Sequence, residues 1–229
     1  MSGEGDMCQE GTMTTESWIR CWEDPKMDFT AKTVNKLFTD YHDQMLRKPC
    51  TRVLVPLCGK ALEMKELMMM GHEVVGIEVS PVACKAFFDE NGIKYEAKHI
   101  DKIPGTVFEG SKNGVKARLY SCDYYQFSPE IEGGFEAVWD SGGLNSIEED
   151  DDKKRYIEVL KPLMAPGCVN LTELCQISDC PYNISEEELG STFGDEFNVK
   201  LLTDVEAWQE MKEMEVNRLK LYLIDRKSK

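Results

Sequence analysis

Two short apolar runs with a helical pattern between them mark the first half of this chain. The first run covers 53–55 and ends in the turn Pro56-Leu57-Cys58-Gly59, whereas the second covers 74–79 and holds an acid, Glu78, near its end. Apolar residues at helical spacing lie between the runs, over 62–70, and predict a helix. Strand, turn, helix and strand in this order predict a βαβ unit of the kind found in nucleoside-binding sheets.

The turn and the acid of this unit indicate what it binds. Gly59 lets the backbone come close to a ligand, and Glu78, about 20 residues further on, is placed to accept hydrogen bonds from both hydroxyls of a ribose. The three-glycine G-x-G-x-x-G spacing is missing, so the case for a bound pyrophosphate is weak. A ligand with a ribose but no phosphate fits better, and S-adenosylmethionine is such a ligand. An ordinary βαβ unit with a solvated Glu78 remains the alternative, because a fold does not fix a function.

The rest of the pattern alternates helices and strands and predicts an α/β fold. An amphipathic helix is expected over 31–48, and further helices are expected to begin near 14, 80, 148 and 185. Strands are expected at 95–97, 106–108, 115–122, 135–140, 168–177, 199–202 and 216–225. Turns are expected at 110–114 and 166–167, and a short helix or loop over 203–208. We expect one domain over 1–229, with an N-terminal segment 1–48 and a core over 49–229.

The composition restricts the class of protein. At 229 residues, with 41% hydrophobic and 30% charged residues, the chain is typical of a globular protein. Its net charge of −15 argues against binding to nucleic acids or anionic membranes, which need basic surfaces. No apolar run is long enough to span a membrane, and no signal peptide is visible. We therefore expect a cytoplasmic monomer that acts on a small molecule, with no nucleic-acid or membrane partner.

The metal-binding residue types do not form a recognisable metal site. The nine cysteines are odd in number and form no C-x-x-C pair, which favours free thiols in a reducing compartment over disulfides or zinc. The acidic run over 148–152 is better explained by the positive end of a helix dipole, so no metal is expected. The only histidines are His42, His72 and His99, and none is a convincing base. We interpret His72, at the end of a predicted helix, as structural.

Motifs spread over most of the chain resemble the thiopurine S-methyltransferase family of class I methyltransferases. They are Trp18-Ile-Arg-Cys-Trp22, Pro56-Leu-Cys-Gly-Lys-Ala61 with Glu63-Met64, Gly71-His72, Val74-Val-Gly-Ile-Glu-Val-Ser80, Ile103-Pro-Gly-Thr106, Trp139-Asp140 and Leu221-Tyr-Leu223. The resemblance implies a Rossmann-like, mostly parallel seven-stranded-type sheet flanked by helices, with 1–48 as an N-terminal helical cap. It also implies S-adenosylmethionine as methyl donor and the sulfur of a small aromatic or heterocyclic thiol, such as a thiopurine, as acceptor.

The resemblance gives the N-terminal segment a role in the site. Trp18 and Trp22 are four residues apart and share one helix face. By themselves they indicate a helix fastened to the core. In similar enzymes this segment covers the donor, and the aromatic residue of the following loop, here Phe29, approaches the acceptor. A lid is chemically sensible, because methyl transfer from a sulfonium is faster when water is excluded.

Further donor-binding residues are expected at the ends of predicted strands. Leu57 and Gly59 form the turn after the first strand, and Asp123 with Tyr124 follows the strand over 115–122. In class I methyltransferases such an acid commonly binds the amine of adenine, while the bulky neighbour packs on its ring. An acid in an ordinary strand-end turn is the alternative for Asp123. Ser141, at the end of the strand over 135–140, is expected to pass close to the donor.

Ser141 is the main departure from the family pattern. Many members carry Arg there, as part of the active site, and its absence here leaves other soft acceptors open, such as halide, sulfide, selenium or arsenic compounds. A thiol that ionises near neutral pH needs little base catalysis, although Asp140 is placed to assist a proton transfer. A donor-binding protein without turnover is a further alternative. The case for an NAD-dependent dehydrogenase is weak, since the glycine fingerprint is missing.

Overall fold

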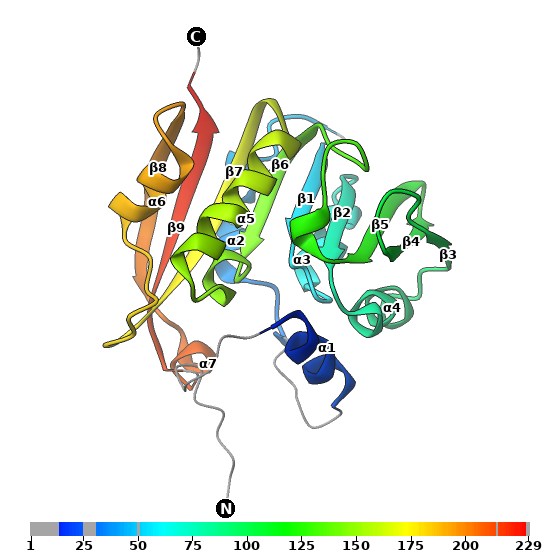
Figure 1. The fold of residues 1–229 in the computed structure, drawn as a ribbon, viewed down its shortest axis with the longest axis horizontal. Helices are drawn as coiled ribbons and strands as arrows, with labels where there is room; N and C mark the ends of the chain where they lie inside the picture. The colour runs from blue at the N-terminus through cyan, green and yellow to red at the C-terminus, as the bar shows by residue number, and fades with distance from the viewer. Residues whose placement is uncertain (1–13, 25–30, 50, 214, 228–229) are drawn as a thin grey trace, which may run out of the picture.

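One mixed sheet organises the chain (Figure 1). A computed structural model describes residues 14–24, 31–49, 51–213 and 215–227. Over these residues nine strands form the sheet, in the order β3-β4-β5-β2-β1-β6-β7-β9-β8. The strands are β1 (Arg52–Pro56), β2 (Glu73–Glu78), β3 (Tyr95–His99), β4 (Gly105–Lys112), β5 (Val115–Cys122), β6 (Phe135–Ser141), β7 (Met164–Ile177), β8 (Phe197–Glu206) and β9 (Val216–Arg226).

The centre of the sheet is parallel and its two sides are antiparallel. Strands β5, β2, β1, β6 and β7 pair in parallel, and β9 runs antiparallel between β7 and β8. This is the expected seven-stranded arrangement, to which β3 and β4 add an antiparallel extension beside β5. The carboxyl ends of the parallel strands therefore meet at one edge, which is the edge nearest the N-terminal helix in Figure 1.

Helices cover both faces of the sheet. The helices are α1 (Thr15–Glu23), α2 (Lys36–Tyr41), α3 (Leu62–Met69), α4 (Pro81–Glu90), α5 (Asp150–Leu163), α6 (Glu186–Phe193) and α7 (Gln209–Lys212), with 3-10 turns η1 (His42–Gln44), η2 (Tyr124–Gln126) and η3 (Leu144–Ser146). Apolar side chains of α2, α3 and α4 form one core with the sheet, and those of α5 and α6 form a second core on the opposite face. Two layers of helices around a largely parallel sheet are what the predicted alternation requires.

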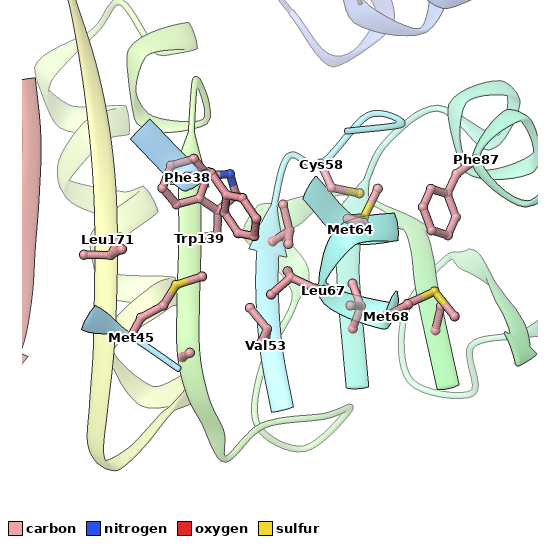
Figure 2. Packing of buried hydrophobic residues seen from close by; sticks show 14 of the residues in the cluster. Phe38, Met45, Val53, Cys58, Met64, Leu67, Met68, Phe87, Trp139 and Leu171 are labelled. Atoms are coloured by element: carbon pink, nitrogen blue, oxygen red, sulfur yellow. The ribbon is translucent and has the colours of Figure 1, made fainter. Parts of the chain in front are cut away.

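The first core fastens α2 to the middle of the sheet. Figure 2 shows Phe38 of α2 against Trp139 of β6, with Met45 beside them. The two ring centroids lie 5.2 Å apart with the ring planes at 70°, an edge-to-face arrangement that aromatic pairs prefer. All three side chains are fully buried, and burying each contributes roughly 1.5–3 kcal/mol. The position of α2 over β6 is therefore fixed by packing.

Two predicted boundaries in the first half of the chain were wrong. The helix expected over 31–48 is short, because Asn35 caps it: its side chain accepts from the N–H groups of Leu37 and Phe38. The turn expected over 110–114 contains only Asn113 and Gly114, with φ of 54° and 83°. Two consecutive residues with positive φ make the tight hairpin turn whose twist matches the paired strands.

Two boundaries in the second half were also wrong. The predicted turn over 166–167 falls within the bounds of β7, at an irregularity where β6 pairs with Met164 and next with Val169 and where Gly167 has a φ of 78°. The residues from Thr203 to Glu206, expected as helix or loop, extend β8, because β9 pairs with all of them. Pairing with a neighbouring strand decided this second case. Within the described ranges, no helix is long and apolar enough to cross a membrane.

Candidate functional site

The turn after β1 and the end of β2 meet at the carboxyl edge of the sheet. Leu57 has a φ of 44° and Gly59 a φ of 49°, so the chain makes a tight left-handed turn here. A positive φ is costly for a residue as bulky as Leu57, and such backbone strain is concentrated at functional sites. The N–H of Gly59 donates to Glu78 Oε2 at 3.0 Å, and the N–H of Ser80 donates to Glu78 Oε1 at 2.7 Å. The backbone thus fixes the carboxylate in one orientation.

Glu78 is well suited to accept further hydrogen bonds. Its side chain is 6% exposed, and burial raises its pKa, while the backbone N–H groups act in the opposite direction by stabilising the charged form. A carboxylate offers about four lone-pair positions, and two backbone donors leave the others available. The acid predicted to bind a ribose therefore lies at the strand end and is oriented by two backbone N–H groups. Gly59, without a side chain, lets a neighbouring side chain approach the backbone of the turn closely.

Helix α1 packs directly on this turn. Thr14 caps the helix by accepting from the N–H of Ser17 at 3.2 Å, as the sequence predicts for its start. A Cβ built on Gly59 would lie 2.8 Å from Cζ2 of Trp22, so the indole covers the glycine. Trp18 and Trp22 are both partly buried. The predicted pair therefore lies at the carboxyl edge of the sheet, where α1 is drawn in Figure 1. Phe29 lies outside the described residues.

The acid and the aromatic residue after β5 differ in their surroundings. Asp123 is half-buried, and its Oδ1 accepts from the N–H of Tyr125 at 2.9 Å, so it caps η2. The ring of Tyr124 is buried at 4% exposure and stacks on Tyr156, with centroids 4.6 Å apart. Its hydroxyl donates to the carbonyl of Tyr156 at 3.2 Å. The structure therefore assigns the Tyr124 ring to the second core, while Asp123 remains accessible at the strand end.

Asp140 shapes the loop after β6. It is 1% exposed, its Oδ2 accepts from the Tyr156 hydroxyl at 3.1 Å, and its Oδ1 accepts from the N–H of Leu144 at 3.3 Å. Burial raises its pKa to about 6. A Cβ on Gly143 would approach Asp140 Oδ1 to 2.6 Å, so the loop closes on the carboxylate because position 143 has no side chain. One oxygen thus holds the loop and the other binds α5, which does not favour the predicted proton transfer by Asp140.

Ser141 belongs to a network that the sequence did not predict. Asn35 Nδ2 donates to Glu173 Oε2 at 2.6 Å and lies 3.4 Å from Ser141 Oγ. The backbone N–H of Asn35 donates to Glu63 Oε1, also at 2.6 Å. One residue before α2 therefore connects the end of β6, the end of β7 and the start of α3. Ser141 itself is half-buried, at the boundary between this network and the solvent.

The two glutamates of the network are unusual in their burial. Glu63 is 6% exposed and Glu173 is 2% exposed. Burial raises the pKa of both carboxyls, and that of Glu173 reaches about 7 even though the Asn35 amide donates to it. Glu173 lies in a long apolar strand, and an isolated acid in such a run is the signal that identifies it from sequence. Its partners Asn35 and Glu63 are distant in sequence, so only the fold brings them together.

His72 and the acidic run at the start of α5 lie as the sequence predicts. His72 is buried, and its Nδ1 accepts from the N–H of Thr51 at 3.0 Å, as a structural residue would. Burial lowers the pKa of this imidazole. In the part of the chain that the structure describes, no group of histidines, cysteines and acids is arranged to hold a metal ion. Asp150, Asp151 and Asp152 form the first turn of α5, which is where the helix dipole favours acids.

Comparison with known protein families gives a match over nearly the whole chain. The family described as "Thiopurine S-methyltransferase (TPMT)" matches residues 13–227. A curated relative from Danio rerio, named probable thiopurine S-methyltransferase, is 32% identical over 216 residues, which cover 92% of this chain and 90% of the relative. The thiopurine S-methyltransferase of Bos taurus is 31% identical over 209 residues, covering 88% and 84%.

Solved structures share the fold at low sequence identity. The N-methyltransferase NodS from Bradyrhizobium japonicum WM9, in complex with S-adenosyl-L-homocysteine, has a TM-score of 0.63 at 14% identity and covers 94% of this chain and 100% of its own. A Burkholderia thailandensis 1,6-didemethyltoxoflavin-N1-methyltransferase has a TM-score of 0.61 at 13% identity, with coverages of 93% and 87%. These likenesses confirm the predicted methyltransferase fold.

Proposed function

This chain belongs to the thiopurine S-methyltransferase family, and we therefore propose that it transfers a methyl group from S-adenosylmethionine to the sulfur of a small aromatic or heterocyclic thiol. The observation that carries the proposal is the Glu78 carboxylate, held by the N–H groups of Gly59 and Ser80 at the carboxyl edge of the sheet. That edge is where open α/β sheets bind their ligands. An oriented acid beside a tight glycine turn fits a ribose-bearing donor without a phosphate.

We assign the site residues by their places around this edge. Glu78 binds the ribose hydroxyls, Asp123 binds the adenine amine, and the backbone of Leu57 and Gly59 lies along the donor. Trp18 and Trp22, on the helix that packs against the turn, exclude water from above. Of the other predicted residues, Tyr124 contributes its backbone, Ser141 lines the acceptor side, and Phe29 lies in the loop that would approach the acceptor.

The donor supplies an activated methyl group on a sulfonium, so the protein contributes mainly by positioning. Held near 3–3.5 Å and in line, an attacking sulfur gains several kcal/mol from orientation alone. Trp22 over Gly59 and the Asp140-supported loop make the walls of that arrangement. The chain brings an oriented acid, an aromatic cover and a loop of fixed shape to one place.

Its setting in the cell is part of the same proposal. The described cysteines carry free thiols, and three of them, Cys58, Cys84 and Cys122, are buried near the donor turn. Burial raises the pKa of each of these thiols, which makes them unreactive. Free thiols in this number fit a cytoplasmic enzyme. We propose that it works as a monomer on a small molecule, without a nucleic-acid or membrane partner.

The test is transfer of labelled methyl from S-adenosylmethionine to 6-mercaptopurine, with S-adenosylhomocysteine binding measured on the same sample. Transfer with saturation in both substrates is the expected result. Binding without transfer to this or to other aromatic thiols would contradict the proposed acceptor. Absence of binding would contradict the proposed donor site as well.

A further inference from the structure

Ser141 lies between the solvent-facing side of the carboxyl edge of the sheet and the buried carboxylate of Glu173. It pairs with Glu173 in the sheet, where β6 and β7 run parallel, and the two side chains share the Asn35 amide. Ser141 is half-buried, whereas Glu173 is 2% exposed. We propose that Glu173 accepts, through the Ser141 hydroxyl, the proton of an acceptor thiol that is not already ionised.

The inference rests on the proposed methyl transfer and completes its proton balance. A lone pair of the acceptor's sulfur forms the new bond to the methyl carbon, and the bond between that carbon and the donor's sulfonium breaks, leaving its electron pair on the donor's sulfur. The acceptor's proton passes to Ser141 Oγ while the Ser141 hydroxyl proton passes to Glu173. The sulfonium loses its positive charge and the carboxylate its negative charge, so the atoms and charges balance.

Asn35 fixes the carboxylate for this role. Its Oδ1 accepts from the N–H groups of Leu37 and Phe38 at 2.8 and 3.3 Å, so the other end of the amide must be the donor. That end holds Glu173 Oε2 at 2.6 Å. A neutral amide cannot take the proton from the acid and cannot neutralise it as a cation would. Ser141, which pairs with Glu173 in the sheet, accepts from the same amide at 3.4 Å and is more exposed than the carboxylate.

The charges around Glu173 favour proton uptake. Glu63 of α3 and Asp140 of β6 act on it from two elements, and both are acids, while β9 places Leu221 opposite it. Burial with these neighbours raises the pKa of Glu173 to about 7. A base is most effective when its pKa lies near the working pH. Asp140, by contrast, already binds Tyr156 and Leu144 with its two oxygens.

The hydroxyl of Ser141 allows the proton to pass from the acceptor thiol to Glu173. A hydroxyl both donates and accepts, so it can receive one proton while it releases another. Arg carries only donors and stays charged, and beside Glu173 it would hold the carboxylate ionised. With Ser141, the site can therefore use a thiol that must lose its proton as well as a pre-formed thiolate.

The test compares two acceptors that differ in ionisation at neutral pH. One is 5-thio-2-nitrobenzoate, which is a thiolate, and the other is benzyl mercaptan, which keeps its proton. For Glu173→Gln we expect kcat with benzyl mercaptan to fall about 10²–10⁴-fold, while kcat with the thiolate stays within about threefold. The midpoint of the increase in the benzyl mercaptan rate with pH should also shift, because the base that sets it has been removed. Ser141→Ala should lower kcat more with benzyl mercaptan than with the thiolate, and Ser141→Thr, which keeps a hydroxyl, should restore most of the activity with benzyl mercaptan.

A structural role for Glu173 predicts something different. Equal losses with both acceptors, or no loss with benzyl mercaptan, would overturn the inference. A second readout needs no donor: infrared difference spectra of the ligand-free protein between about pH 5 and pH 9 should show, beside the Asp140 signal near pH 6, a protonated carboxyl band that titrates near pH 7 and is missing in Glu173→Gln. Absence of that band from the wild type would also overturn it. If the wild type methylates neither thiol, the proposed function itself fails, whatever the spectra show.

Discussion

A Cβ built on Gly59 lies 2.8 Å from Cζ2 of Trp22, so helix α1 and the donor turn are in direct van der Waals contact. The same glycine donates its N–H to Glu78. One residue therefore connects the aromatic cover, the strained turn and the proposed ribose-binding acid. A substitution of Gly59 should therefore affect the Trp22 contact, the turn and the orientation of Glu78.

We predict that Gly59→Ala lowers both stability and donor affinity. With φ at +49°, an L-residue costs about 1–2 kcal/mol in backbone energy, and the added methyl group also has to displace the Trp22 ring. Gly92→Ala is the matched control, because φ there is +60° and a Cβ meets nothing within 4 Å. Urea denaturation and calorimetry with S-adenosylhomocysteine should show a larger free-energy loss and weaker binding for position 59 alone. Equal losses would show that the Trp22 contact does not matter.

We predict that Glu78→Gln weakens binding of S-adenosylhomocysteine by roughly 1–3 kcal/mol. The amide keeps the shape but turns an N–H₂ group toward the backbone donors of Gly59 or Ser80, and it loses the charge that strengthens bonds to ribose hydroxyls. Glu96→Gln, at a side chain 78% exposed on β3, is the control and should leave the affinity unchanged. An unchanged dissociation constant for Glu78→Gln would refute the ribose role.

We predict that Tyr156→Phe destabilises the fold more than Tyr124→Phe. The Tyr156 hydroxyl donates to the buried carboxylate of Asp140, whereas the Tyr124 hydroxyl donates to a neutral carbonyl. Hydrogen bonds to charged groups contribute about 1.5–3 kcal/mol, against about 0.5–1.5 kcal/mol for neutral pairs. The free energies of unfolding in urea at pH 8, where Asp140 is ionised, should differ accordingly. A larger loss for Tyr124→Phe would contradict the assignment of Asp140 as the loop's anchor.

We predict that Glu173 makes the protein less stable as the pH rises toward neutrality. Its pKa is raised from 4.5 to about 7 by burial, so the folded chain binds the proton more tightly than the unfolded chain. The stabilisation is complete below about pH 4.5 and is lost as the pH rises through about 7. Between pH 5 and pH 8 the wild type should lose about 2–3 kcal/mol more than Glu173→Gln. Asp140 titrates in both proteins, so the difference between the two profiles reports Glu173 and its coupling to Asp140; parallel pH profiles would contradict the prediction.

Local sequence determined most of the elements because their signals lie within a few residues. Ser185 with Glu188 forms the capping box that begins α6, and Ser80-Pro81 begins α4, as predicted. Glu78 stands at the end of β2 because a strand followed by a turn places its last acid at the sheet edge. The turn over 56–59, with Gly59, and the acid Glu78 could therefore be predicted without a structure.

Pairing and packing decided the rest. Thr203 to Glu206 became strand because β9 offers hydrogen bonds along its whole length, and the helix expected over 31–48 was shortened because Asn35 turned its side chain to cap it. Tyr124 went into the core because Tyr156, far along the chain, stacks on its ring. The strand and the buried ring depend on partners outside their own segments, β9 for Thr203 to Glu206 and α5 for Tyr124, whereas the Asn35 cap is a local signal.

The sequence by itself determined the family, the βαβ unit and the acid at the end of β2, since each rests on residues that are neighbours in the chain or form a continuous motif. Only the tertiary structure decided that Ser141 adjoins a buried Glu173 and that Asn35 holds both. Those three residues come from β6, β7 and the start of α2, and they meet because the sheet places parallel strand ends side by side. Their burial, which sets the proton affinity of Glu173, is likewise a property of the folded chain alone.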